Sequence, residues 1–138
     1  MLGMDTAHVI YLGDLRNEAV HLRSGERIIT DAPPDNQGKG EAFSPTDLMS
    51  TSLACCMMSI MGIAARERGL PLDGLEARVV KHMASDPRRV ARIEVHLAMD
   101  GSGLDDKART ILERAARTCP VALSLREDLI QDVTFSYR

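Results

Sequence analysis

Three cysteines are the residues of this sequence whose type and spacing could do chemistry. Cys55 and Cys56 are adjacent, whereas Cys119 lies far from them along the chain. This set does not make an even extracellular disulfide framework, and in a reducing compartment such thiols are typical of catalytic, metal-binding or buried positions. The N-terminus has no basic region before an apolar run, so we expect a cytoplasmic protein.

Cys119 has a recognisable local environment because a proline follows it. Pro120 suits the first position of a helix, which would place Cys119 at the N-cap. Free amide hydrogens and the helix dipole favour a thiolate there. The alternative is a buried cysteine that only fills space, and the spacing alone does not decide between the two.

Cys55 and Cys56 lie within a long predicted helix. Adjacent helical residues point about 100° apart, so at most one of the two thiols can face a given pocket. Cysteine is often buried, and Met57 and Met58 follow directly, which favours ordinary packing for the other one. The residues alone do not choose between Cys55 and Cys56.

A metal or cofactor site is not indicated. The four histidines are scattered through predicted strands, and the sequence has no Cys-x-x-Cys and no His-x-x-x-His. Gly38-Lys39-Gly40 does not join a strand to a helix with the spacing of a phosphate-binding loop. We therefore expect no metal and no cofactor.

The composition excludes some classes of protein. A chain of 138 residues fits a single domain over 1–138, and its formal net charge of −3 gives no basic footprint for nucleic acid. Leu48 to Ala65 carries no charge, near the lower limit for a membrane span. Several serines, a threonine and a glycine interrupt that stretch, so we expect no membrane span.

The hydropathy pattern predicts an α+β domain. Ser44 as cap, Pro45 at the first position and Asp47 three residues after the cap mark the start of the long helix, and Gly69 marks its end. The predicted elements are strands 8–12, 18–22 and 27–30, a loop at 31–40, helix 45–68, an antiparallel hairpin of strands 75–83 and 92–99, a helix ending near 118, a short helix 121–126 and a strand 133–138.

The composition of the long helix also favours a homodimer. It is apolar nearly all round and so must be covered on more than one side. The chain offers few other elements to cover it, so we expect a second copy to supply the missing wall in a homodimer.

Three segments together resemble the OsmC/Ohr family of osmotically inducible and organic hydroperoxide resistance proteins. They are Gly40 to Leu48, Ser52 to Met57, and Cys119-Pro120-Val121. The resemblance implies an OsmC-like fold, with antiparallel sheets wrapped around a long central helix. It also implies an intertwined homodimer with two active sites at the interface.

The resemblance also implies roles for individual residues. Cys56, eleven residues after Pro45, takes the place of the peroxidatic cysteine, and Cys119 that of the resolving cysteine. Arg16 takes the place of the arginine that stabilises the thiolate. Thr46 stands where the family's hydroperoxide reductases carry a glutamate that pairs with this arginine. The candidate replacements are Glu41, Glu18 and Asp47.

The expected function is that of a thiol peroxidase acting on organic hydroperoxides. A Cys56 thiolate would become a sulfenic acid, Cys119 would condense with it to a disulfide, and an external dithiol, such as a lipoyl protein, would reset it. Apolar walls would favour bulky peroxides, and the expected wall residues are Leu53, Met57, Met58 and Met61. The competing hypotheses are a non-catalytic dimer that binds a small apolar ligand and a thiol redox sensor.

Overall fold

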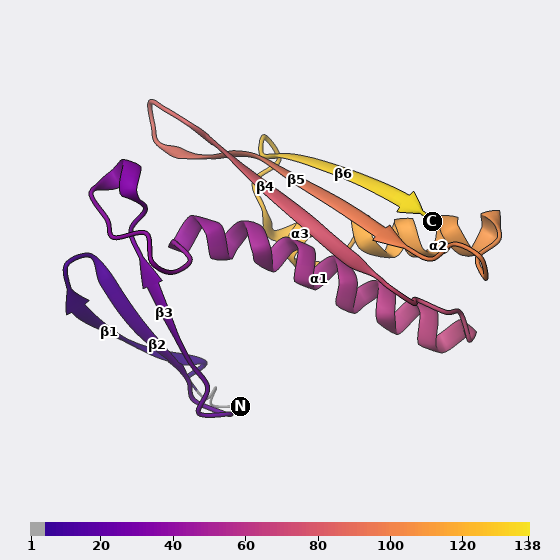
Figure 1. The fold of residues 1–138 in the computed structure, drawn as a ribbon, viewed down its shortest axis with the longest axis horizontal. Helices are drawn as coiled ribbons and strands as arrows, with labels where there is room; N and C mark the ends of the chain where they lie inside the picture. Colours follow the sequence, from indigo (N-terminus) through magenta and orange to yellow (C-terminus); the bar gives the residue numbers. More distant parts are fainter. Residues whose placement is uncertain (1–4) are drawn as a thin grey trace. The chain divides into compact units, whose positions relative to one another are not determined.

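The computed structural model describes residues 5–138, which form two compact units. The first unit ends at Leu48 and the second runs from Met49 to Arg138. The chain contains two sheets, a long helix and shorter helices (Figure 1), which confirms the predicted α+β class. The assignment of the whole chain to one domain stays a prediction.

The first unit contains a three-stranded antiparallel sheet in the order β1-β2-β3. Strand β1 spans Ala7–Gly13, β2 spans Arg16–His21 and β3 spans Arg27–Asp31. A turn that includes Gly25, whose φ is +78°, joins β2 to β3, and glycine adopts such angles without strain.

Both faces of this sheet carry exposed apolar side chains. Side chains alternate between the two faces along a strand, so Val9 and Tyr11 share one face of β1 and Ile10 and Leu12 the other. All four are exposed, as is Ile28 on β3. The sheet therefore has no buried core of its own on either face.

The segment after β3 was predicted as a surface loop, and it is held close to the end of that strand. It contains a short 3-10 helix, η1, over Pro34–Asn36. The Gly40 amide donates to the Ala32 carbonyl at 3.2 Å. A Cβ atom on Gly38 would lie 1.7 Å from the Ala32 carbonyl oxygen, so only glycine fits there. The segment thereby returns the chain to β3 just before Glu41.

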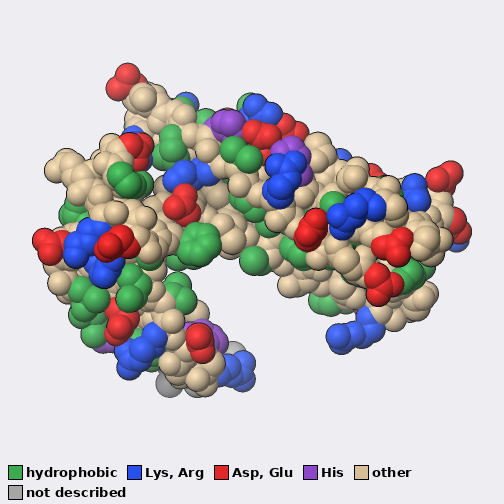
Figure 2. Space-filling model, in the orientation of Figure 1, with side chains coloured by type: hydrophobic (Ala, Val, Ile, Leu, Met, Phe, Trp, Pro, Cys, Tyr) green, Lys and Arg blue, Asp and Glu red, His purple; other side chains and the backbone are tan. Residues whose placement is uncertain are grey.

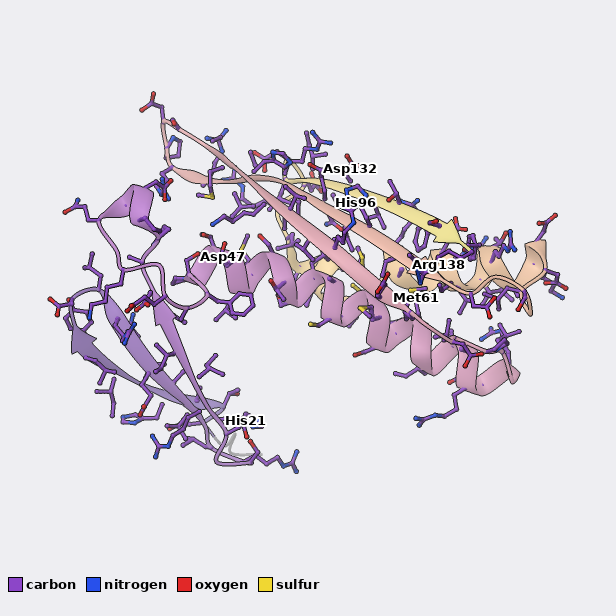
Figure 3. The ribbon with its side chains drawn as sticks, in the orientation of Figure 1. His21, Asp47, Met61, His96, Asp132 and Arg138 are labelled. Atoms are coloured by element: carbon purple, nitrogen blue, oxygen red, sulfur yellow. The ribbon has the colours of Figure 1, made fainter. Side chains whose placement is uncertain are left out.

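Helix α1 spans Pro45–Arg68, as predicted. The Ser44 hydroxyl accepts a hydrogen bond from the Asp47 amide at 3.0 Å, and the Asp47 carboxylate accepts one from the Ser44 amide at 3.0 Å. This is a reciprocal capping box. Asp47 lies in the first turn of the helix (Figure 3), and Gly69, with φ of +63°, follows its last residue.

The second unit contains the sheet β4-β5-β6. Strand β4 spans Glu76–Ala84, β5 spans Arg89–Met99 and β6 spans Ile130–Tyr137. The hairpin of β4 and β5 is antiparallel, as predicted.

The expectation of antiparallel pairing is wrong for β6, which runs parallel to β5. Two helices lie between these strands, α2 over Asp106–Arg117 and α3 over Pro120–Ser124. This helical crossover returns the chain to the end of the sheet where β5 began, so β6 must run in the same direction as β5.

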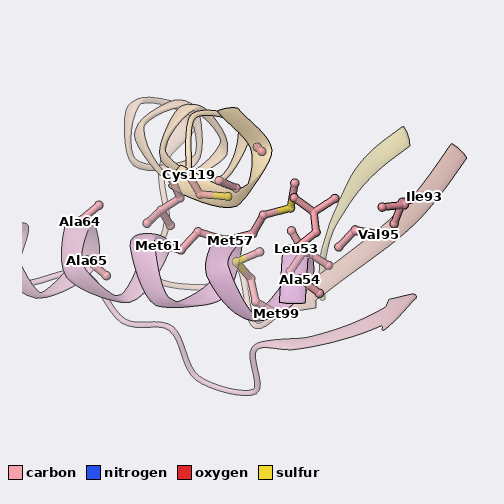
Figure 4. Packing of buried hydrophobic residues seen from close by; sticks show 14 of the residues in the cluster. Leu53, Ala54, Met57, Met61, Ala64, Ala65, Ile93, Val95, Met99 and Cys119 are labelled. Atoms are coloured by element: carbon pink, nitrogen blue, oxygen red, sulfur yellow. The ribbon is translucent and has the colours of Figure 1, made fainter. Parts of the chain in front are cut away.

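The core of the second unit lies between α1, the sheet and α2. Leu53, Met57 and Met61 are spaced four residues apart on α1 and are fully buried. They belong to one cluster with Ile93 of β5 and Leu112 of α2. Figure 4 shows Leu53 near Val95, and Met57 and Met61 beneath Cys119.

Helix α1 is long and apolar enough to cross a membrane, by length and composition alone. A third of its apolar 18-residue stretch is buried within the chain. The core helix of a globular protein passes the same test, and the packing of Leu53, Met57 and Met61 is of that kind.

Leu112→Ala should lower the free energy of unfolding by about 2 to 5 kcal/mol, because it removes a fully buried side chain and leaves a cavity. The control is Leu123→Ala, the same change at a residue of α3 that is 72% exposed, which should cost less than about 0.5 kcal/mol. Urea denaturation measures both. Equal losses would contradict the assignment of the core.

Candidate active site

The structure brings Cys56 of α1 close to the beginning of α3. The Val121 amide donates a hydrogen bond to the Cys56 sulfur at 3.5 Å, although the two residues are 65 positions apart. Cys119 is the N-cap residue of α3, as predicted, and is fully buried, whereas Cys56 is partly exposed. The two thiols are close enough to interact electrostatically.

Cys55 does not take part in this arrangement. It is exposed, while Cys56 packs against the core cluster that contains Cys119. The rotation of about 100° between neighbouring helical residues turns only one of the two thiols toward α3. Of the two cysteines, Cys56 is therefore the one that lies beside α3, a point that the residues alone left open.

Arg16 lies at the beginning of β2, and two carboxylates bind it. Its Nε donates to Asp31 Oδ1 at 2.7 Å and its Nη2 to Asp31 Oδ2 at 2.8 Å. Nη2 also donates to Glu41 Oε1 at 2.9 Å. Asp31 is fully buried and accepts a further bond from the Glu41 amide at 3.1 Å.

The three candidate carboxylates for Arg16 differ in what they contact. Glu41 binds Arg16, Glu18 binds Arg27 at 2.7 Å, and Asp47 caps α1.

Sequence reasoning missed Asp31, the carboxylate that binds Arg16 through two oxygens. The strand register carried the signal for it. The turn at Ser24-Gly25 sets Val20 opposite Arg27, and the same register sets Arg16 opposite Asp31.

Three of the four residues expected to line a substrate pocket are core residues of this chain. Leu53, Met57 and Met61 are fully buried, and only Met58 is partly exposed. A side chain with no exposed surface presents nothing to a substrate. Within this chain, Met58 is the one of the four with exposed surface, and the substrate wall stays a prediction.

The family model for OsmC-like proteins matches residues 38–131. The chain belongs to the OsmC family. No match is found among curated protein sequences.

Solved structures extend the likeness to nearly the whole chain. A protein from Psychrobacter arcticus 273-4, provisionally named for the osmotic stress induced and detoxification response, is 52% identical, with a TM-score of 0.92 and 98% of both chains covered. An OsmC-like protein from Mycoplasma pneumoniae is 17% identical, with a TM-score of 0.80 and both chains fully covered. An organic hydroperoxide resistance protein OsmC from Legionella pneumophila is 18% identical, with a TM-score of 0.72 and coverage of 99% and 98%. The last two establish the fold alone.

The two thiols of this OsmC family member differ in their surroundings. Burial raises the pKa of the Cys119 thiol, and the neighbouring Cys56 adds to the rise, while the Ala122 and Val121 amides act in the opposite direction. Desolvation outweighs the amides of the helix start, so the pKa of Cys119 lies above its usual range although the residue is an N-cap. Cys119 is a protonated thiol at neutral pH.

Two of the histidines, His82 and His96, lie on the β4–β5 hairpin. Over residues 5–138, no group of three or more His, Cys, Asp or Glu side chains is placed to hold a metal ion. His82 and His96 both hydrogen-bond Glu94, and together they lower the pKa of its carboxyl. His96 lies on β5 and Asp132 on β6 (Figure 3). Figure 2 shows acidic, basic and histidine side chains side by side on this face of the molecule.

The raised pKa of Cys119 makes stability depend on pH. The folded state keeps the Cys119 proton above the pKa of an unfolded thiol, near 8.5, so its contribution is complete below about pH 8 and is lost as pH rises. Between about pH 8 and 9.5, the free energy of unfolding of the reduced protein should fall with pH, by at most about 1.4 kcal/mol per unit from this group.

Cys119→Ala should make this part of the pH profile flatter, whereas Cys55→Ala should leave it as in the wild type. Chemical denaturation under reducing conditions at each pH measures the profile. A slope that Cys119→Ala leaves unchanged would show that another group is responsible. The Tyr137 hydroxyl, whose pKa burial also raises, titrates above this window.

Proposed function

We propose that this chain is a thiol-dependent peroxidase that reduces organic hydroperoxides through Cys56 and Cys119. The observation that carries the proposal is the approach of the Cys56 sulfur to the first turn of α3, where it accepts from the Val121 amide beside Cys119. Membership of the OsmC family supports it, as do relatives named organic hydroperoxide resistance proteins.

The burial of the two sulfurs supports separate roles for them. Cys56 is partly exposed, so a peroxide can reach it, and its sulfur accepts a hydrogen bond from the Val121 amide. Cys119 is buried and its raised pKa keeps it protonated. Cys56 is therefore the thiol that attacks the peroxide, and Cys119 is the thiol that then reacts with the oxidised Cys56.

The reaction then has three balanced steps. The Cys56 thiolate attacks one peroxide oxygen, the O–O bond breaks, and with one proton the products are an alcohol and a Cys56 sulfenic acid. The Cys119 thiol attacks the sulfenic sulfur, forms the disulfide and releases water. An external dithiol, such as a dihydrolipoyl group, reduces the disulfide by exchange and is itself oxidised to a disulfide.

Arg16 is proposed to stabilise the Cys56 thiolate. A guanidinium near a thiolate lowers the pKa of the thiol, because the opposite charge favours the ionised form. Asp31 and Glu41 bind Nε and Nη2 of Arg16, and neither of them contacts Nη1. The Nη1 edge is the part of the guanidinium that can bind an anion.

The active protein is proposed to be a cytoplasmic homodimer. The exposed apolar residues on both faces of the β1–β3 sheet support an assembly that covers them. Ile63, 51% exposed on α1 between buried residues of the same helix, supports a contact at that helix face. A second copy of the chain would cover both the exposed sheet faces and Ile63.

The first test follows the consumption of cumene hydroperoxide with dihydrolipoamide as the reductant, and maps the disulfides by mass spectrometry after oxidation without the dithiol. We expect a Cys56–Cys119 disulfide that forms as the peroxide is consumed. Cys56→Ser should reduce consumption by at least about a thousandfold, because it removes the nucleophile. Cys119→Ser should give a single turnover and leave a Cys56 sulfenic acid that a dimedone probe traps.

Cys55→Ser is the matched control, since Cys55 is exposed and adjacent to Cys56, and this variant should keep wild-type turnover. A disulfide that joins Cys55 to Cys119, or consumption that survives in Cys56→Ser, would overturn the mechanism. Lack of consumption by the wild-type protein would favour the non-catalytic ligand-binding dimer.

The second test concerns assembly. Ile63→Arg should weaken the dimer by about tenfold or more, because a dimer contact there would bury an unpaired charge. Val80→Arg, at a residue of β4 that is 37% exposed, should leave it intact. Sedimentation velocity over a dilution series measures both. A monomeric wild-type protein, or equal effects of the two changes, would contradict the proposed interface.

A further inference from the structure

The outward face of the β4–β6 sheet is a polar surface that the proposed reaction does not use. The apolar side chains of β5, such as Val95 and Leu97, are buried in the core cluster that contains Cys119. Side chains alternate between the two faces of a strand, so His96 and Ala98 of β5 lie on the opposite face. A site on this face is therefore separate from the two thiols.

A cavity of about 270 Å³ opens on this outward face, at the end of the sheet where β4 begins and β6 ends. The strand register explains the hollow. Ala98 of the central strand lies between Glu76 of β4 and Ser136 of β6, and its small side chain leaves the floor of the cavity low. Pockets for drug-sized ligands span roughly 300 to 1,000 Å³, so this cavity has room for a smaller molecule.

Arg78 is the cationic group of this cavity that remains available to a ligand. It lies opposite His96 on the neighbouring strand and is exposed. Within residues 5–138, no carboxylate, hydroxyl or carbonyl group binds its guanidinium. A guanidinium presents its N–H donors in a planar fork that matches the oxygens of a carboxylate or a phosphate. The donors of Arg78 are therefore suited to an oxyanion.

Ser136 and Arg138 add further donors at the same cavity. The Ser136 hydroxyl likewise makes no hydrogen bond within the described part of the chain. Arg138, which follows the end of β6 (Figure 3), donates to Glu76 Oε1 at 3.2 Å and to the Gly74 carbonyl at 3.1 Å. These two bonds hold it at the edge of the cavity. Two arginines and one glutamate line the cavity, so its lining carries a net positive charge.

His96 and Thr134 form the remaining polar wall of the cavity. His96 Nδ1 and the Thr134 hydroxyl share a hydrogen bond of 2.7 Å, and His96 Nε2 hydrogen-bonds Glu94 at 2.9 Å. Both ring nitrogens therefore already have partners. The polar groups left to a ligand are the two guanidinium groups and the Ser136 hydroxyl, and together they favour a negatively charged acceptor over a cation.

We propose that this cavity binds a small molecule through an oxyanion group, a carboxylate or a phosphate. Arg78 is its main contact, and Ser136 and Arg138 supply further hydrogen bonds. The proposal goes beyond the peroxidase reaction, because it uses neither Cys56 nor Cys119.

The experiment titrates the wild-type protein with inorganic phosphate and, separately, with acetate, and it follows the backbone-amide NMR signals. Sodium chloride keeps the ionic strength constant, since salt screens exposed charges. We expect saturable shifts at the cavity, around Arg78, Ala98 and Ser136, with a Kd of about 1 to 10 mM for at least one anion. Tighter binding of phosphate would identify a phosphate group as the ligand, and tighter binding of acetate a carboxylate.

Three variants test the contacts. Arg78→Gln should weaken binding by about tenfold or more, because it removes the charged donor. Ser136→Ala should weaken it by about threefold, the effect of one neutral hydrogen bond. Ala98→Leu keeps every charge but fills the floor of the cavity, so it should abolish the saturable shifts.

Arg23→Gln is the matched control, because it makes the same change at an exposed arginine between β2 and β3, which does not line the cavity. It should leave the Kd within about twofold of the wild-type value. Circular dichroism reports whether each variant folds, and Ala98→Leu tests the proposal even if Arg78→Gln fails to fold.

Three results would overturn the proposal. They are the absence of saturable shifts with both anions, a wild-type Kd in Arg78→Gln or Ala98→Leu, and an equal loss in Arg23→Gln. The last two would show that the anions respond to surface charge in general. None of these measurements involves a peroxide or a thiol, so failure of the proposed peroxidase reaction would leave this test unchanged.

Discussion

The packing of the first turn of α3 against α1 is the contact on which the candidate site depends. It brings the Val121 amide to the Cys56 sulfur across 65 positions of sequence, and it places the Cys119 thiol beside that sulfur. The core cluster of α1, α2 and the β4–β6 sheet holds both helices in place. Loss of this packing would move the two thiols apart even if neither cysteine were changed. The proposed reaction between them therefore depends on the core as well as on the cysteines.

The same packing makes the two thiols unequal. Desolvation is the main cause of the raised pKa of Cys119, and it exceeds the favourable effect of two backbone amides. Cys56 lies at the edge of the cluster, where part of its surface remains exposed. Two equally exposed thiols would not show which one meets a molecule from solvent first. Here Cys56 is partly exposed and Cys119 is buried, so only Cys56 is open to solvent.

Local rules predicted most of the elements, and long-range contacts explain what those rules missed. The capping residues Ser44 and Asp47 fixed the start of α1, and alternation fixed the strands of the β4–β5 hairpin. The direction of β6 depends on the crossover through α2 and α3, which no strand pattern encodes. The choice of Cys56 over Cys55 depends on which side of α1 is covered by α3, and the pattern of an almost wholly apolar helix does not specify that side.

The carboxylates around Arg16 show the same dependence on long-range contacts. A guanidinium requires an acceptor at a given place in space, and the chain can supply it from a helix start, a neighbouring strand or a loop. Here β3 supplies Asp31 through the strand register, and the returning segment supplies Glu41, while Asp47 and Thr46 remain at the start of α1. Strand register compares positions across the sheet, and it places Asp31 opposite Arg16.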